Sequence, residues 1–217
     1  MTRKKILNDD LSQLDAKLMP YWVDIANKNK HGLNLSYVET PQGVLDKIKN
    51  KNNHDQRYII RISDRIPHSA VIDVKSINGK PSILFFESSK SSSDASGMLT
   101  FNVKLALEKV NLSDRFCVVE LDIQRSHYDC AMFSLAIAKK IHKHEEAIYS
   151  LHKFIADNKM TKPNAEGFIR KNISDKFLPA DFYKHTQSKY RIQEYLKANP
   201  ENKNSFINKK MKTSLMS

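Results

Sequence analysis

Apolar positions recur along this chain with two different periods, and the change between them separates predicted helices from predicted strands. Helical spacing predicts helices over residues 9–30, with Pro20 as a break or a second start, and over 41–51, 96–109, 130–151 and 181–198. Short apolar runs rich in Ile, Val and Phe predict strands over 57–62, 69–75, 82–87 and 115–123. Helices that flank a central group of strands predict an α+β fold with a mostly antiparallel central sheet.

The strongest local signal is the dipeptide Asn78-Gly79 between two of these strands. Asn-Gly suits the two central positions of a tight β-hairpin, which need positive φ angles. With that turn Ile77 pairs with Lys80, and His68 becomes the diagonal neighbour of Glu87, about 7–8 Å away at Cα. A carboxylate at that distance can orient an imidazole and raise its basicity. For this pair alone, the alternative is a strand-edge histidine and a solvated carboxylate.

A second candidate lies where the predicted strand 115–123 leads through a polar segment into the helix that begins near Cys130. Asp129 suits the N-cap position, and a cysteine in the first turn meets the helix dipole and free N–H groups that stabilise a thiolate. Beside a His–Glu pair it would complete a nucleophile, base and orienter. The Gln124 amide could then donate to an oxyanion. The alternative is a small buried residue, which is how we interpret Cys117 in its apolar strand.

Charge adds a question about partners. The 217 residues include 36 Lys and Arg against 24 Asp and Glu, a formal net charge of +12, and half of that excess lies in residues 184–217. Such a chain could bind nucleic acid or an anionic surface, but it has no helix-turn-helix, zinc-finger or RNP motif, so nucleic acid is not expected as a partner. No apolar run approaches the roughly 20 residues of a membrane span, so integral membrane association is not expected either.

The remaining polar features have ordinary interpretations. Two cysteines exclude a disulfide scaffold and a zinc site built from three or four thiolates. The histidines at 142, 144 and 152 lack a His-Glu-x-x-His pattern, so we expect a solvated helix face and no metal site. The serine-rich stretch 88–94 predicts a flexible surface loop.

Taken together, these motifs resemble the YopJ family of bacterial type III secretion effectors. The resemblance covers roughly residues 19–210 and rests on the order His68, Glu87, Cys130 and on several surrounding blocks: Ile77-Asn78-Gly79-Lys80, Val119 to Ser126, Asp129-Cys130, Phe133-Ser134 and Leu178-Pro179 with Phe182 to Gln187. It implies a core like that of the ubiquitin-like-protein-specific cysteine proteases. It also implies acetyl transfer from acetyl-coenzyme A to Ser, Thr or Lys of host signalling proteins such as kinases, with inositol hexakisphosphate as activator.

Position by position, the resemblance implies that Cys130 is the nucleophile, His68 the base and Glu87 its orienter, with Gln124 as oxyanion donor. Lys184 matches a lysine that serves regulation and self-acetylation in the family. The predicted contacts to inositol phosphate or coenzyme A are basic residues: Arg57, Arg125, Lys184, His185, Lys189 and Arg191. The alternative function is a cysteine protease or deubiquitinase, because thioester and peptide attack need the same three groups.

The resemblance also implies an organisation and a destination. We expect an N-terminal helical segment over 1–55, a catalytic core over 56–160, and a basic regulatory segment over 161–217 that packs with the first. We expect the protein to be secreted and delivered into the cytoplasm of a host cell.

A third and less specific function is charge-driven binding to a nucleic acid or a membrane surface.

Overall fold

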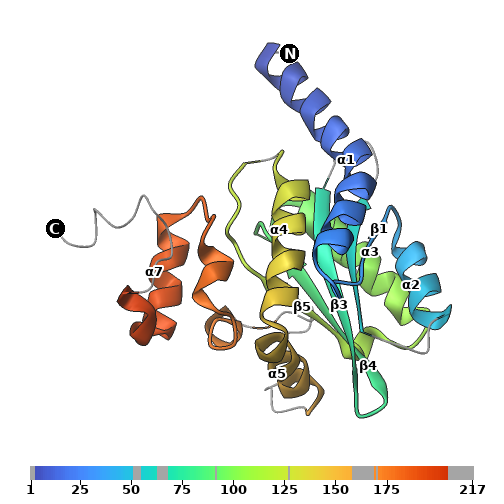
Figure 1. Cartoon of the computed structure of the whole chain (residues 1–217), viewed down its shortest axis with the longest axis vertical. Coiled ribbons are helices and arrows are strands. Elements are labelled where there is room, and N and C mark those ends of the chain that lie inside the picture. Colours follow the sequence, from blue (N-terminus) through green and yellow to red (C-terminus); the bar gives the residue numbers. More distant parts are fainter. Residues whose placement is uncertain are drawn as a thin grey trace.

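The computed structural model describes residues 3–50, 55–62, 68–90, 92–126, 128–157, 169 and 171–204, and its centre is a five-stranded sheet (Figure 1). The strands, in spatial and chain order alike, are β1 Leu35–Val38, β2 Gln56–Ile62, β3 His68–Ile77, β4 Lys80–Glu87 and β5 Phe116–Glu120. The central strands β2, β3 and β4 are antiparallel, whereas β1 and β5 run parallel to their neighbours. The predicted α+β class is confirmed, and the sheet is mixed, with an antiparallel centre and a parallel strand at each edge.

The helices surround this sheet. They are α1 Arg3–Asn29, α2 Pro41–Asn50, α3 Asp94–Glu108, α4 Cys130–Lys143, α5 Glu145–Ala156, α6 Lys171–Ser174 and α7 Lys189–Ala198, with 3-10 turns η1 Ser113–Arg115, η2 Ala180–Tyr183 and η3 Pro200–Asn204. Helix α1 continues through Pro20. The predicted helix 130–151 is two helices that meet at His144, and the predicted helix 181–198 is η2 followed by α7. No helix in the described ranges is long and apolar enough to cross a membrane.

Each face of the sheet is covered by its own helices (Figure 1). Successive strand residues point to opposite faces, so Ile59 and Val71 join a core with α1, α4 and α5, whereas Ile60 and Ile72 join one with α2 and α3. The first core also includes apolar residues of the C-terminal segment 171–204. The predicted division at 1–55, 56–160 and 161–217 stays a prediction, although β1 of the first range belongs to the sheet.

The β3–β4 hairpin has the predicted turn. Asn78 and Gly79 have φ angles of 53° and 73°, and Ile77 pairs with Lys80. Because β4 runs antiparallel to β3 and β5 runs parallel to β4, the start of β3 and the ends of β4 and β5 all lie at the end of the sheet opposite this turn. This end of the sheet therefore brings together residues that are far apart in the sequence.

Candidate active site

His68 and Glu87 meet at the end of the sheet opposite the hairpin turn, as the hairpin register predicts. His68 Nε2 and Glu87 Oε2 are 2.8 Å apart, and both side chains are buried. The second carboxylate oxygen of Glu87 accepts hydrogen bonds from the backbone N–H and the hydroxyl of Ser89, each 2.9 Å long. With one oxygen held by Ser89, the other is directed at the imidazole, so Glu87 can fix the orientation of His68.

Cys130 completes the predicted set. It is the first residue of α4, its side chain is buried, and His68 is hydrogen-bonded to it. Burial on its own lowers the pKa of His68, but the charge of Glu87 and the hydrogen bonds to Cys130 and Glu87 outweigh burial and raise this pKa to about 10. His68 therefore carries its proton at neutral pH. An imidazolium beside a cysteine favours the thiolate, which is the nucleophilic form.

The free energy of unfolding is expected to depend on pH through His68. The pKa of His68 is about 10 in the folded state and about 6.5 in the unfolded state, so the bound proton stabilises the fold. This contribution of His68 to the unfolding free energy is complete below about pH 6.5 and is lost as pH rises toward 10. Chemical denaturation of wild type and His68→Gln at about pH 6, 8 and 9.5 measures it. The difference in unfolding free energy should shrink at each step, and a difference that grew with pH would contradict the proposed ion pair.

The segment between β5 and α4 is tied to the end of β4 and to the residue after it. The N–H of Leu121 donates to the carbonyl of Glu87 at 2.8 Å, and that of Gln124 donates to the carbonyl of Ser88 at 2.9 Å. The side-chain oxygen of Gln124 accepts from the Ser88 hydroxyl at 2.6 Å, and its amide donates to the Ser126 carbonyl at 2.6 Å. The prediction of a flexible serine-rich loop was wrong at its start, because Ser88 is buried and hydrogen-bonded to Gln124. The role of Gln124 as oxyanion donor stays a prediction.

Asp129 stands at the N-cap position of α4, but within the described residues its side chain makes no capping bond. It accepts instead from the Ser126 hydroxyl at 2.5 Å and from the side-chain amide of Gln187 at 3.3 Å. Gln187 was part of the family-like block, yet nothing in its spacing placed it here. The contact joins residues 58 positions apart, a separation that a single sequence does not reveal.

Two of the predicted phosphate contacts lie in the interior instead. Arg57 is 2% exposed and pairs with Asp73 and Glu145, each at 2.9 Å. Arg191 is 1% exposed, and its guanidinium bonds both oxygens of Asp175. Both guanidinium groups are held in buried ion pairs by these carboxylates, so we withdraw Arg57 and Arg191 as candidate phosphate contacts.

The other predicted phosphate contacts reach the surface. Lys184, His185 and Lys189 are exposed, and Arg125 is partly exposed with one nitrogen 2.6 Å from Asp122. Lys140 lies beside this group. Burial lowers the pKa of Lys140, and together with the charges of Lys184 and Lys143 it outweighs the opposing charge of Asp181 and brings this pKa to about 8. Burial and the charges of Lys140 and Lys184 likewise lower the pKa of His185. An anion bound there would relieve this mutual repulsion.

One of the three histidines predicted on a solvated helix face, His152, lies in the core instead. His152 is fully buried and lies 2.9 Å from the Ser82 hydroxyl and 3.0 Å from the carboxylate of Asp73. Its hydrogen bonds satisfy a polar group inside the core, as burial requires. Across the described ranges, no cluster of three or more His, Cys, Asp or Glu side chains is arranged to hold a metal ion.

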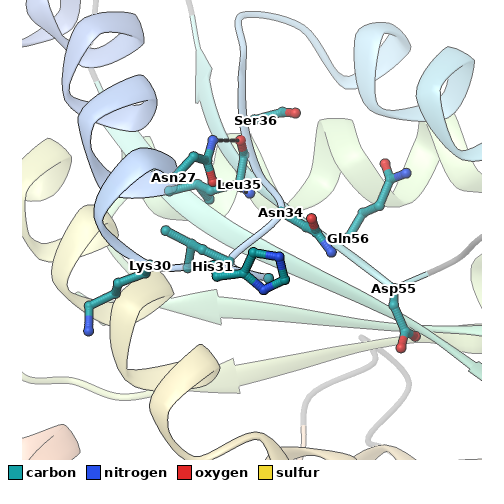
Figure 2. A pocket seen from close by; sticks show the side chains of 10 residues that line it. Asn27, Lys30, His31, Asn34, Leu35, Ser36, Asp55 and Gln56 are labelled. Carbon is teal, nitrogen blue, oxygen red and sulfur yellow. Dashed lines mark hydrogen bonds between the residues drawn. The ribbon is translucent and has the colours of Figure 1, made fainter.

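A pocket of about 490 Å³ lies away from these groups, between the end of α1 and the start of β2 (Figure 2). Lys30, His31, Asn34 and Gln56 are among its lining residues. Gln56 pairs with a β3 residue that is six positions beyond His68, which is roughly 20 Å along the strand. The pocket is therefore separate from the candidate active site.

Comparisons with known proteins show which family the chain belongs to. The family model described as YopJ Serine/Threonine acetyltransferase matches residues 1–217. The serine/threonine-protein acetyltransferase YopJ of Yersinia pestis is 38% identical over 207 residues, which cover 93% of this chain and 71% of the relative. YopJ of Yersinia pseudotuberculosis is 37% identical over the same shares of both chains.

Solved structures are similar as well. A structure described as AvrA delL154 with IP6 and CoA has a TM-score of 0.79 and 33% identity, covering 92% of this chain and 75% of that one. HopZ1a in complex with IP6 has a TM-score of 0.69 over 86% of this chain and 69% of that one, and at 21% identity it shows the fold alone. The resemblance inferred from the sequence is confirmed, and the chain belongs to the YopJ serine/threonine acetyltransferase family.

Proposed function

We propose that this chain transfers acetyl from acetyl-coenzyme A through Cys130 to Ser, Thr or Lys side chains of proteins. The observation that carries the proposal is the contact of His68 with both Glu87 and Cys130, in a chain that matches the acetyltransferase family throughout. Cysteine proteases use the same groups, but the relatives found are named acetyltransferases, and none of the comparisons favours the protease.

The chemistry follows from the protonated imidazole of His68 beside the Cys130 sulfur. The Cys130 thiolate attacks the thioester carbonyl, and the bond to the coenzyme A sulfur breaks as the acetyl-cysteine thioester forms. His68 gives its proton to the departing thiolate and becomes a neutral base. It then takes the proton from the acceptor hydroxyl or amine as that group attacks the acetyl-cysteine, and Cys130 leaves as the thiolate.

The anion groups follow the same proposal. AvrA has been solved with IP6 and CoA. We assign inositol hexakisphosphate to the cationic group of Lys184, His185 and Lys189, with the partly buried Lys140 as its neighbour. Several phosphates on one ring would offset several clustered positive charges at once. We assign a phosphate of coenzyme A to Arg125, in the segment between β5 and α4.

The biological setting is proposed from the same family. The YopJ relatives from Yersinia are serine/threonine-protein acetyltransferases. We propose host signalling proteins, kinases among them, as the acceptors, and delivery into the cytoplasm of the host cell as the destination.

The test is mass spectrometry of the intact chain and its peptides after incubation with acetyl-coenzyme A. We expect acetyl on Cys130 in acid-quenched samples, and about 5- to 150-fold faster labelling with inositol hexakisphosphate, the usual range of an allosteric coupling. Lys184→Ala should weaken this response, whereas Lys197→Ala, an exposed lysine on α7, should not. Cleavage of a ubiquitin-like substrate without any acetyl label would instead establish the protease alternative.

A further inference from the structure

A single side chain from the C-terminal segment holds the loop that leads to Cys130. The side-chain oxygen of Gln187 accepts from the backbone N–H of Arg125 at 2.6 Å and from that of Ser126 at 2.8 Å. Its amide donates to the Ser126 hydroxyl and to the carboxylate of Asp129, both at 3.3 Å. One glutamine thus contacts three residues of the five that precede Cys130.

The backbone around Gln187 strengthens this contact. The N–H of Gln187 donates to the carbonyl of Ile123 at 2.8 Å, and the hydroxyl of Thr186 donates to the same carbonyl at 3.3 Å. The C-terminal segment therefore contacts this part of the chain at Ile123, Arg125, Ser126 and Asp129. Gln187 itself remains exposed, so its bonds are made at the surface of the loop and not in a packed core.

The loop carries groups that the chemistry needs. It begins beside Gln124, the proposed oxyanion donor, whose amide bonds the carbonyl of Ser126, and it ends at the first residue of α4. Gln187 bonds both the N–H and the hydroxyl of that same Ser126. A change in Gln187 therefore reaches Gln124 through one shared residue and Cys130 through Asp129.

We propose that Gln187 is a positioning residue for acetyl transfer, because it holds the 124–129 loop in the geometry that Cys130 and Gln124 require. The inference rests on the proposed function of Cys130. It gives the C-terminal segment a role in the active site, through a side chain that acts on the loop leading to Cys130. The residues that we assign to inositol hexakisphosphate, Lys184 and His185, immediately precede Thr186 and Gln187 in the chain.

A glutamine is suited to this position because its amide accepts two bonds and donates two at once. A glutamate keeps the accepting oxygens, but when ionised it cannot donate, and it places a second carboxylate beside Asp129. Two adjacent carboxylates raise the pKa of one of them. When that proton binds, the acid regains a donor, so Gln187→Glu should recover function at low pH, whereas Gln187→Ala has no group that can recover.

The test measures single-turnover acetylation of Cys130 in the full chain, at saturating acetyl-coenzyme A and with inositol hexakisphosphate present. We expect Gln187→Ala to slow acetylation about 10- to 100-fold, the scale of a small misplacement of catalytic groups. The melting temperature should change little because the side chain is exposed. Gln193→Ala, an exposed glutamine on α7, is the matched control and should acetylate at the wild-type rate.

Two further readouts separate positioning from a merely structural role. The rate of Gln187→Glu relative to wild type should rise as pH falls from about 8 to 5, the range in which paired carboxylates take up a proton. The losses from Gln187→Ala and Gln124→Ala should be less than additive, because both act through one loop. A folded Gln187→Ala at the wild-type rate, a flat ratio for Gln187→Glu, or fully additive losses would each overturn the assignment. A wild-type chain that takes no acetyl at Cys130 would instead overturn the proposed function, and with it this role.

Discussion

Replacing Cys130 with alanine is expected to abolish transfer of radiolabelled acetyl from acetyl-coenzyme A to the chain. The thiol is the group that bonds the acetyl carbon, and removal of a nucleophile from a catalytic triad lowers the rate by about 10⁴-fold or more. His68 and Glu87 remain in the variant, but neither can form the thioester. The measurement is radiolabel retained on the purified chain after an acid quench.

Cys117 supplies a matched control for this experiment. It lies in β5, it is 1% exposed, and burial raises the pKa of its thiol to about 12. A buried thiol that keeps its proton does not attack a thioester, so Cys117→Ala should retain labelling. Label that persisted in Cys130→Ala and disappeared in Cys117→Ala would reverse the assignment of the nucleophile.

Replacing Arg191 with alanine is expected to lower the free energy of unfolding by about 3–5 kcal/mol, the usual cost of removing one partner of a buried ion pair. Its guanidinium lies 2.8 Å and 2.5 Å from the two oxygens of Asp175, and its Nε donates to the carbonyl of Leu121 at 2.7 Å. In the Arg191→Ala variant the carboxylate of Asp175 stays buried. It keeps the hydrogen bond from the Tyr183 hydroxyl but loses the cation that balances its charge. Urea denaturation followed by circular dichroism measures the loss.

Two variants test whether the loss comes from the ion pair. Lys189→Ala removes an exposed cation from the same helix and should change the unfolding free energy by less than about 0.5 kcal/mol. A double variant that replaces both Asp175 and Arg191 with leucine removes the stranded charge, so it should be more stable than Arg191→Ala alone. Equal losses in Arg191→Ala and Lys189→Ala would contradict the buried pair.

The hairpin shows what a sequence can predict. The turn chemistry of Asn78-Gly79 sets the register, the register sets which side chains are neighbours, and His68 and Glu87 were paired on that basis alone. The start of α4 at Cys130 was also readable, because the change from a polar segment to helical periodicity marks it. These are local features whose geometry is fixed within a few residues.

The errors come from features that depend on distant residues. Arg57 and Arg191 were predicted as contacts to inositol phosphate or coenzyme A, because composition does not show that Asp73 and Asp175 meet them in the interior. His152 was placed on a solvated face for the same reason, since its partner Asp73 is 79 positions away. Strand β1, with four residues and parallel pairing to β2, has too short an apolar run to be predicted.

The contact between Arg191 and Leu121 spans 70 positions, and that between Gln187 and Ser126 spans 61. A ribosome releases the chain from its N-terminus, so His68, Glu87 and Cys130 all emerge well before the residues that hold the loop between them. Contacts of long sequence separation also form slowly, because they close large loops. During synthesis there is accordingly an interval in which the nascent chain already contains its nucleophile, base and orienter. In that interval the segment that joins β5 to Cys130 still lacks its hydrogen bonds to Gln187 and Arg191.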